Sequence, residues 1–159
     1  MRAILLIDHG SMRQEANHML DCMGNLVQLM AGDAAVVRIA HMELAPPTVA
    51  EGFAACVEAG ATEIVVFPYM LSPGKHSTRD IPRMVGEAAA RYPGVRYVVS
   101  PAFGVSEKLA EVILERAGVA PLQLQTPDRC VRPSGSAPRH CGEGCRELSA
   151  APLNADALV

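Results

Sequence analysis

The sequence predicts an α/β fold in which an open parallel sheet of about four strands, in the order 2-1-3-4, is covered by helices on both faces. Three observations predict it: short apolar runs alternate with segments of helical periodicity, the links between them are short, and the alternation continues to Gly118. Strand-helix-strand units with short links form parallel sheets. Right-handed crossovers favour this order, which makes the first and third strands neighbours.

Four apolar runs are the expected strands. The first contains Ile4 to Ile7 without a polar interruption, which is typical of a strand buried on both faces. The expected strands span Ala3–Ile7, Ala35–Ala40, Ile64–Phe67 and Val95–Val99.

Helical periodicity follows each strand. Residues 14–31 carry apolar side chains three and four residues apart, in one stripe: Ala16, Met19, Leu20, Met23, Leu26, Val27 and Met30. Residues 46–59 open with Pro46-Pro47, which a first helical turn tolerates. The third helix, residues 80–92, is expected to begin at Asp80 as its N-cap, and the fourth, residues 105–117, to stop at Gly118.

Length and composition indicate one ordinary domain with a tail. The chain has 159 residues, of which 50% are hydrophobic, and a formal net charge of −3. This charge gives no general attraction to nucleic acid or to an anionic membrane. No apolar run approaches the roughly 20 residues that span a bilayer, and the first residues lack a signal-peptide layout, so we expect a cytoplasmic protein, or a plastid stromal one if the source is a photosynthetic eukaryote. Residues 1–118 form the expected α/β domain, and residues 119–159 a proline-rich, cysteine-containing tail.

Two histidines follow strands that we expect to be neighbours. His9 comes directly after the first strand, and His76 lies in the Pro-Gly loop after the third. Adjacent strands are about 4.8 Å apart, so two imidazoles at this edge can share one divalent metal ion. Glu43, after the second strand, adds a carboxylate at the same edge. His41 points away from this group in the expected alternation, and we interpret it as a structural residue.

Basic residues accompany the two histidines. Lys75 and Arg79 flank His76, Arg83 follows one helical turn later, and Arg13 lies shortly after His9. In a chain with net negative charge, this local concentration of positive charge favours a ligand with several carboxylates.

Four segments together resemble the small class II tetrapyrrole chelatases, the sirohydrochlorin chelatase family of the CbiX/SirB type. They are "DHGSMRQEAN", "AHMELAPPTV", "VVFPYMLSPGKHSTRDIP" and "LAEVILERAG", in order along residues 3–117. "DHGS" and "AHMELA" look most like the plant-type sirohydrochlorin ferrochelatases.

The resemblance implies an enzyme that inserts a divalent metal, Fe²⁺ by preference, into sirohydrochlorin without ATP, giving siroheme. It implies that His9 accepts protons and binds the metal, that His76 is the second ligand, and that the chain forms a homodimer. The substrate-binding residues that we expect are Arg13, Glu43, Leu71, Ser72, Pro73, Gly74, Lys75, His76 and Arg79.

The five cysteines fall into two groups. Cys22 and Cys56 lie on apolar helical faces, where we expect buried free thiols. Cys130, Cys141 and Cys145 lie in the tail. Similarity in position to plant-type ferrochelatases implies that they bind a [2Fe–2S] cluster, although their spacing departs from that family's pattern and an incidental set of thiols is the alternative. Three thiolates cannot complete a four-cysteine set, so His140 or a second subunit would be needed.

Other functions remain as alternatives. Cobalt insertion into sirohydrochlorin for cobalamin synthesis would use the same ligands, because imidazole and carboxylate do not separate Fe²⁺ from Co²⁺. A non-catalytic metal or tetrapyrrole carrier would need the same site without the reaction. A hydrolase that uses Ser11 is disfavoured, because the G-x-S-x-G elbow is missing around that serine.

Overall fold

The computed structural model describes residues 1–122, which fall into two compact units. The first unit runs from Met1 to Ala102, and the second begins at Phe103. Each unit is described by itself below.

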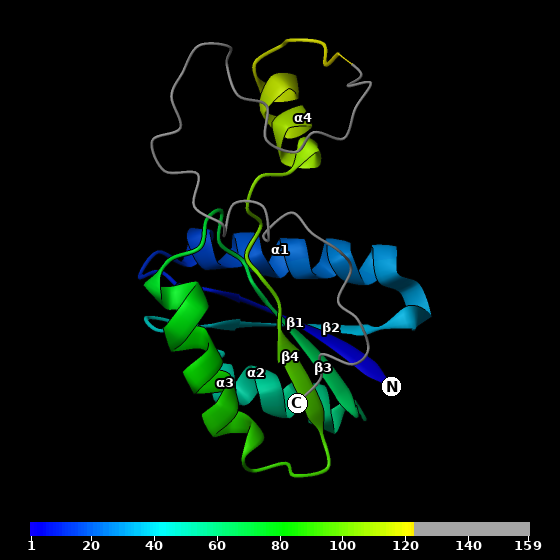
Figure 1. Cartoon of the computed structure of the whole chain (residues 1–159), viewed down its shortest axis with the longest axis vertical. Helices are drawn as coiled ribbons and strands as arrows, with labels where there is room; N and C mark the ends of the chain where they lie inside the picture. The colour runs from blue at the N-terminus through cyan, green and yellow to red at the C-terminus, as the bar shows by residue number, and fades with distance from the viewer. Residues whose placement is uncertain (123–159) are drawn as a thin grey trace, which may run out of the picture. The chain divides into compact units, whose positions relative to one another are not determined.

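The first unit contains the expected four-stranded parallel sheet (Figure 1). Its strands are β1 (Arg2–Asp8), β2 (Val36–His41), β3 (Glu63–Pro68) and β4 (Arg96–Val99). They lie in the order β2-β1-β3-β4, all parallel, so the predicted fold class and strand order are confirmed.

Helices cover both faces of this sheet (Figure 1). Helix α1 (Gln14–Ala31) packs on one face, and α2 (Val49–Glu58) and α3 (Ile81–Ala89) lie on the other. Strand β1 is buried from both sides: Leu5 and Ile7 belong to the larger core cluster with Phe53 of α2, and Leu6 packs with Leu20 of α1. This arrangement explains why β1 is apolar at successive positions.

The apolar stripe of α1 is wider than the face that the sheet covers. Leu20 is buried, whereas Met19, Leu26 and Met30 are exposed. The chain leaves α1 through a short 3₁₀ turn, η1 (Gly32–Ala34), before β2. Periodicity therefore identified the helix but not which of its apolar residues are buried.

Helix α2 begins later than predicted. Thr48, not Pro46-Pro47, precedes its first residue, and a capping box joins Thr48 to Glu51. Thr48 accepts a hydrogen bond from the Glu51 amide, and the Glu51 carboxylate accepts one from the Thr48 amide. Because these bonds satisfy amides that the helix itself cannot, the prolines are left in the preceding loop.

The two cysteines in the described part of the chain differ in solvent exposure. Cys56 of α2 is fully buried, and burial raises the pKa of its thiol to about 12 against a smaller opposing effect of Arg38. Cys22 of α1 is exposed, so the expectation that both thiols are buried was wrong for Cys22.

The second unit contains α4 (Glu107–Arg116) within the described residues. Gly118, with φ 69°, follows its end, as expected for a helix stop. The predicted domain boundary after residue 118 stays a prediction. Among the described residues, no helix is both long and apolar enough to cross a membrane.

Candidate active site

His9 and Glu43 are brought together by hydrogen bonds that continue beyond the ends of β1 and β2. The Met42 amide donates to the Asp8 carbonyl at 3.0 Å, and the Glu43 amide donates to the His9 carbonyl at 3.2 Å. The two segments therefore leave the sheet side by side. As a result, His9 Nε2 lies 3.1 Å from Glu43 Oε1.

A buried contact anchors this pair of segments. Asp8 Oδ1 lies 2.5 Å from Nδ1 of His41 and accepts a hydrogen bond from the Gly10 amide at 2.9 Å. His41 is 1% exposed, in agreement with its interpretation as a structural residue. Asp8 thus ties β2 to the turn that follows His9.

His76 approaches His9 from the end of β3. The Tyr69 amide donates to the Ile7 carbonyl at 2.6 Å, so β3 also stays beside β1 past its last residue. A loop then leads to a π-helical turn, η2 (His76–Asp80), which runs directly into α3. The ring centroids of His9 and His76 are 5.2 Å apart, at an interplanar angle of 72°.

Asp80 stands at the N-cap position of α3, as predicted, but its side chain makes no capping bond and binds His76 instead. Its Oδ2 lies 3.0 Å from His76 Nδ1, and its Oδ1 accepts a hydrogen bond from Arg79 Nε at 3.1 Å. Asp80 itself has helical backbone angles because η2 precedes α3 without a break. Burial raises the pKa of Asp80, but Arg79, His76 and Lys75 outweigh it and lower the pKa overall.

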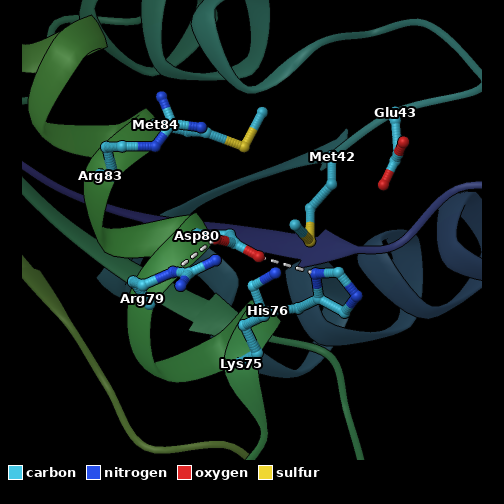
Figure 2. A pocket seen from close by; sticks show the side chains of 8 residues that line it. All are labelled: Met42, Glu43, Lys75, His76, Arg79, Asp80, Arg83 and Met84. Atoms are coloured by element: carbon cyan, nitrogen blue, oxygen red, sulfur yellow. Dashed lines mark hydrogen bonds and ion pairs between the residues drawn. The ribbon is translucent and has the colours of Figure 1, made fainter.

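A cavity of about 330 Å³ opens beside His76 (Figure 2). Figure 2 shows the Asp80 carboxylate between Arg79 and the His76 ring. The cavity is lined by Met42, Glu43, Lys75, His76, Arg79, Asp80, Arg83 and Met84. Four of these were predicted site residues, namely Glu43, Lys75, His76 and Arg79.

Of the other four lining residues, Arg83 belongs to the predicted basic group, whereas Met42, Asp80 and Met84 were not assigned to the site from the sequence. Asp80 carries a signal that could have placed it there, since it lies four residues after His76 and such pairs meet on a helix. Arg83, one turn further along, follows the same spacing from Arg79. Met42 and Met84 are ordinary apolar residues in the sequence, and nothing in the pattern distinguishes them from core residues.

Several predicted site residues lie outside this cavity. Leu71, Ser72, Pro73 and Gly74 form the exposed loop between β3 and η2. Arg13 is exposed and precedes α1 as its N-cap residue. Cys130, Cys141 and Cys145 lie outside the described residues.

The chemistry available at this edge is that of an open, water-accessible site. The side chains of His9, Glu43 and His76 are 46%, 55% and 47% exposed. Within residues 1–122, no three His, Cys, Asp or Glu side chains are grouped as a ready metal site. The three side chains therefore form an open group and not a closed four-ligand cage, and its imidazoles can accept protons near neutral pH.

Comparisons with known proteins identify what this chain is similar to. A family model described as CbiX matches residues 3–120. Sirohydrochlorin ferrochelatase, chloroplastic, of Arabidopsis thaliana is 37% identical over 113 residues, which are 71% of this chain and 50% of that protein. Sirohydrochlorin cobaltochelatase of Priestia megaterium is 32% identical over 130 residues, 80% of this chain and 41% of that protein.

A solved structure agrees with these relatives. The sirohydrochlorin chelatase SirB from Bacillus subtilis subspecies spizizenii, in complex with cobalt, superimposes with a TM-score of 0.69 at 32% identity. The match covers 74% of this chain and 50% of that one. The chain thus spans 41% to 50% of the length of these three relatives.

Proposed function

The chain belongs to the CbiX family, and on that premise we propose that it inserts a divalent metal ion into sirohydrochlorin without ATP. The relatives named above are a ferrochelatase and a cobaltochelatase for this substrate. The observation that carries the proposal is the 5.2 Å separation of the His9 and His76 rings at the carboxyl edge of β1 and β3.

The reaction exchanges one M²⁺ for two pyrrole N–H protons, so the site must both deliver a metal and accept protons. A neutral imidazole, with a pKa of about 6.5 in its ordinary state, does either near neutral pH. We assign proton acceptance and metal binding to His9, and metal binding to His76. Glu43, 3.1 Å from His9 Nε2, stabilises the imidazolium that forms and contacts the substrate.

The carboxylates of sirohydrochlorin require positive charge beside the metal. Lys75, Arg79 and Arg83 line the cavity next to His76 and supply it. The exposed loop of residues 71–74 and the Arg13 side chain would contact parts of the macrocycle that extend beyond the cavity.

We propose Fe²⁺ as the preferred metal, from the likeness to plant-type ferrochelatases, with Co²⁺ insertion as the alternative. The protein ligands do not decide between them, because imidazole and carboxylate bind both ions. Pathway context and metal supply would then determine the product.

An anaerobic spectrophotometric assay tests the function. Sirohydrochlorin is mixed with Fe²⁺, Co²⁺ or Ni²⁺ and either the unchanged protein, His9→Ala or His76→Ala. His18→Ala, an exposed histidine on α1, is the matched control. We expect metal-dependent spectral change with the unchanged protein and His18→Ala, and a loss of about 100-fold or more in the two site variants.

Two results would contradict this proposal. Equal rates in all variants would remove His9 and His76 from the reaction. Binding of sirohydrochlorin without any spectral change on addition of metal would instead indicate a carrier.

We also propose that the chain works as a homodimer. The support is the exposed apolar surface of α1 (Met19, Leu26, Leu29 and Met30), because contiguous exposed apolar residues mark interaction sites. The [2Fe–2S] cluster on the tail cysteines and the compartment, cytoplasm or plastid stroma, stay predictions.

A further inference from the structure

We propose that Asp80 is a positioning residue that fixes the tautomer of His76, so that Nε2 offers its lone pair to the metal. The two side chains are joined by a contact of 3.0 Å between His76 Nδ1 and Asp80 Oδ2. The consequence for metal insertion rests on the proposed function, whereas the tautomer itself does not.

The local backbone places Asp80 for this contact. His76 and Asp80 are the first and last residues of η2, in which the amide of Ile81 donates to the carbonyl of His76. Single π-helical turns inside or beside α-helices are frequent at functional sites. Here the turn places the imidazole and the carboxylate four residues apart on one side, and the carboxylate makes no capping bond to α3.

The chemistry of the acceptor decides which ring nitrogen carries hydrogen. Arg79 Nε donates a hydrogen bond to Oδ1 of Asp80, so Oδ2 is the oxygen that faces Nδ1 of His76. An ionised carboxylate only accepts hydrogen bonds. Nδ1 of a neutral His76 must therefore donate, which leaves Nε2 as the unprotonated nitrogen.

His76 and His9 differ in how many of their ring nitrogens lie near an oxygen acceptor. Both ring nitrogens of His9 lie near oxygen acceptors: Nδ1 is 3.3 Å from the Gly10 carbonyl, and Nε2 is 3.1 Å from Glu43 Oε1. His76, in contrast, has one such acceptor among its described contacts. Nε2 of His76 thus has no oxygen acceptor among the described contacts, which suits a metal ligand, whereas both nitrogens of His9 face acceptors, which suits a group that takes up a proton.

Long-range ¹⁵N–¹H NMR on the metal-free protein at about pH 8, where ordinary histidines are neutral, tests the tautomer directly. We expect the Nδ1–H form of His76 in the unchanged protein. Asp80→Asn should weaken or reverse this preference, because Arg79 donates to the single amide oxygen and the amide NH2 then faces Nδ1. Asp80→Ala should lose this preference. Arg79→Gln should keep it, which separates the His76 contact from the ion pair with Arg79.

A matched control accounts for the general effect of losing an ion-paired carboxylate. Glu63 pairs with Arg2 and Arg96 at the opposite end of the sheet, and its side chain is 22% exposed, against 18% for Asp80. Glu63→Gln should leave the His76 signal unchanged. An Nε2–H form in the unchanged protein, or the same tautomer in Asp80→Ala, would overturn the proposal.

Metal binding gives a second measurement on the folded protein. Titration with Co²⁺ alone should show binding that is about 10- to 100-fold weaker in Asp80→Ala and in Asp80→Asn than in the unchanged protein, and unchanged binding in Glu63→Gln. The Co²⁺ binding that remains in His76→Ala measures binding elsewhere on the chain, and it is subtracted from the binding of the other proteins. Unchanged Co²⁺ binding in Asp80→Ala contradicts the proposal.

The two proposals fail in different ways. An Asp80-dependent tautomer in a protein that never inserts metal would refute the chelatase function and leave the positioning role intact. Metal insertion that is lost in His76→Ala but unaffected in Asp80→Ala would support the chelatase function and refute the positioning role of Asp80.

Discussion

Gly10 lies in the turn between His9 and α1, with φ 83°, a conformation that side chains other than glycine rarely adopt. A Cβ built there would lie 2.0 Å from the Glu43 carbonyl oxygen and 3.1 Å from Cβ of His41. Glycine at this residue therefore allows the segments after β1 and β2 to run close together. This closeness is what places His9 against Glu43.

Gly10→Ala should disturb both stability and the site. The strained φ and the overlap with Glu43 should lower the free energy of unfolding by about 2 kcal/mol. Displacement of His9 should lower the insertion rate by about 100-fold. Urea unfolding and the anaerobic assay measure the two effects.

Gly94→Ala is the control for the Gly10 experiment. Its Cβ would meet nothing within 4 Å, so stability and rate should be close to those of the unchanged protein. Full activity in Gly10→Ala would show that the close approach to Glu43 is not needed.

At the scale of single elements, the start of α2 is held by side chains and not by the prolines before it. Thr48 and Glu51 exchange hydrogen bonds in a capping box, and the bonds from Thr48 lower the pKa of Glu51 below 4.5, with burial as a smaller opposing effect. Helix α2 supplies Phe53 and Cys56 to the core on one face of the sheet. The capping box therefore stabilises the N-terminal end of a helix that covers one face of the sheet.

The cap should make stability depend on pH in the acid range. Because the folded pKa of Glu51 is lowered, its contribution is fully present above 4.5 and is lost as pH falls through the folded value. Unfolding of the unchanged protein and of Glu51→Gln should be compared from about pH 6 to about pH 3. We expect the difference between them to shrink toward low pH.

Thr48→Ala tests the same cap without a change in charge. It should lower the free energy of unfolding by about 1 kcal/mol, through loss of the bond from the Glu51 amide. Parallel pH curves for the unchanged protein and Glu51→Gln would show that the carboxylate does not stabilise the helix start.

At the scale of the whole molecule, the exposed apolar residues of α1 are the basis for the proposed homodimer. Met19 is 71% exposed and Met30 is 80% exposed, although both belong to the stripe that identifies the helix. Packing against the sheet explains why Leu20 is apolar, but it does not explain why the exposed residues Met19 and Met30 are apolar.

Light scattering should therefore give twice the chain mass of 16.9 kDa. Leu26→Glu, in the middle of this surface, should shift the equilibrium toward monomer. Ala90→Glu adds the same charge at an exposed residue next to α3 and should leave the mass unchanged. A monomer at micromolar concentration, or equal masses for all three proteins, would contradict the proposed interface.

The architecture, and the edge at which the candidate site lies, could be predicted from the order of residues alone. Apolar runs and helical periodicity report local structure, and parallel strands place their carboxyl ends together, so His9, Glu43 and His76 could be assigned to one edge without coordinates. The same reasoning located Lys75 and Arg79 beside them.

Which side chains interact could be read from the folded chain and not from the sequence. The structure showed that Asp80 binds His76 and makes no capping bond to α3, that Asp8 holds His41 and the Gly10 turn, and that part of the α1 stripe is exposed. These contacts depend on strand register, on rotamers and on how the helices lie across the sheet. Periodicity along the chain carries no such information, because one spacing is compatible with several partners in three dimensions.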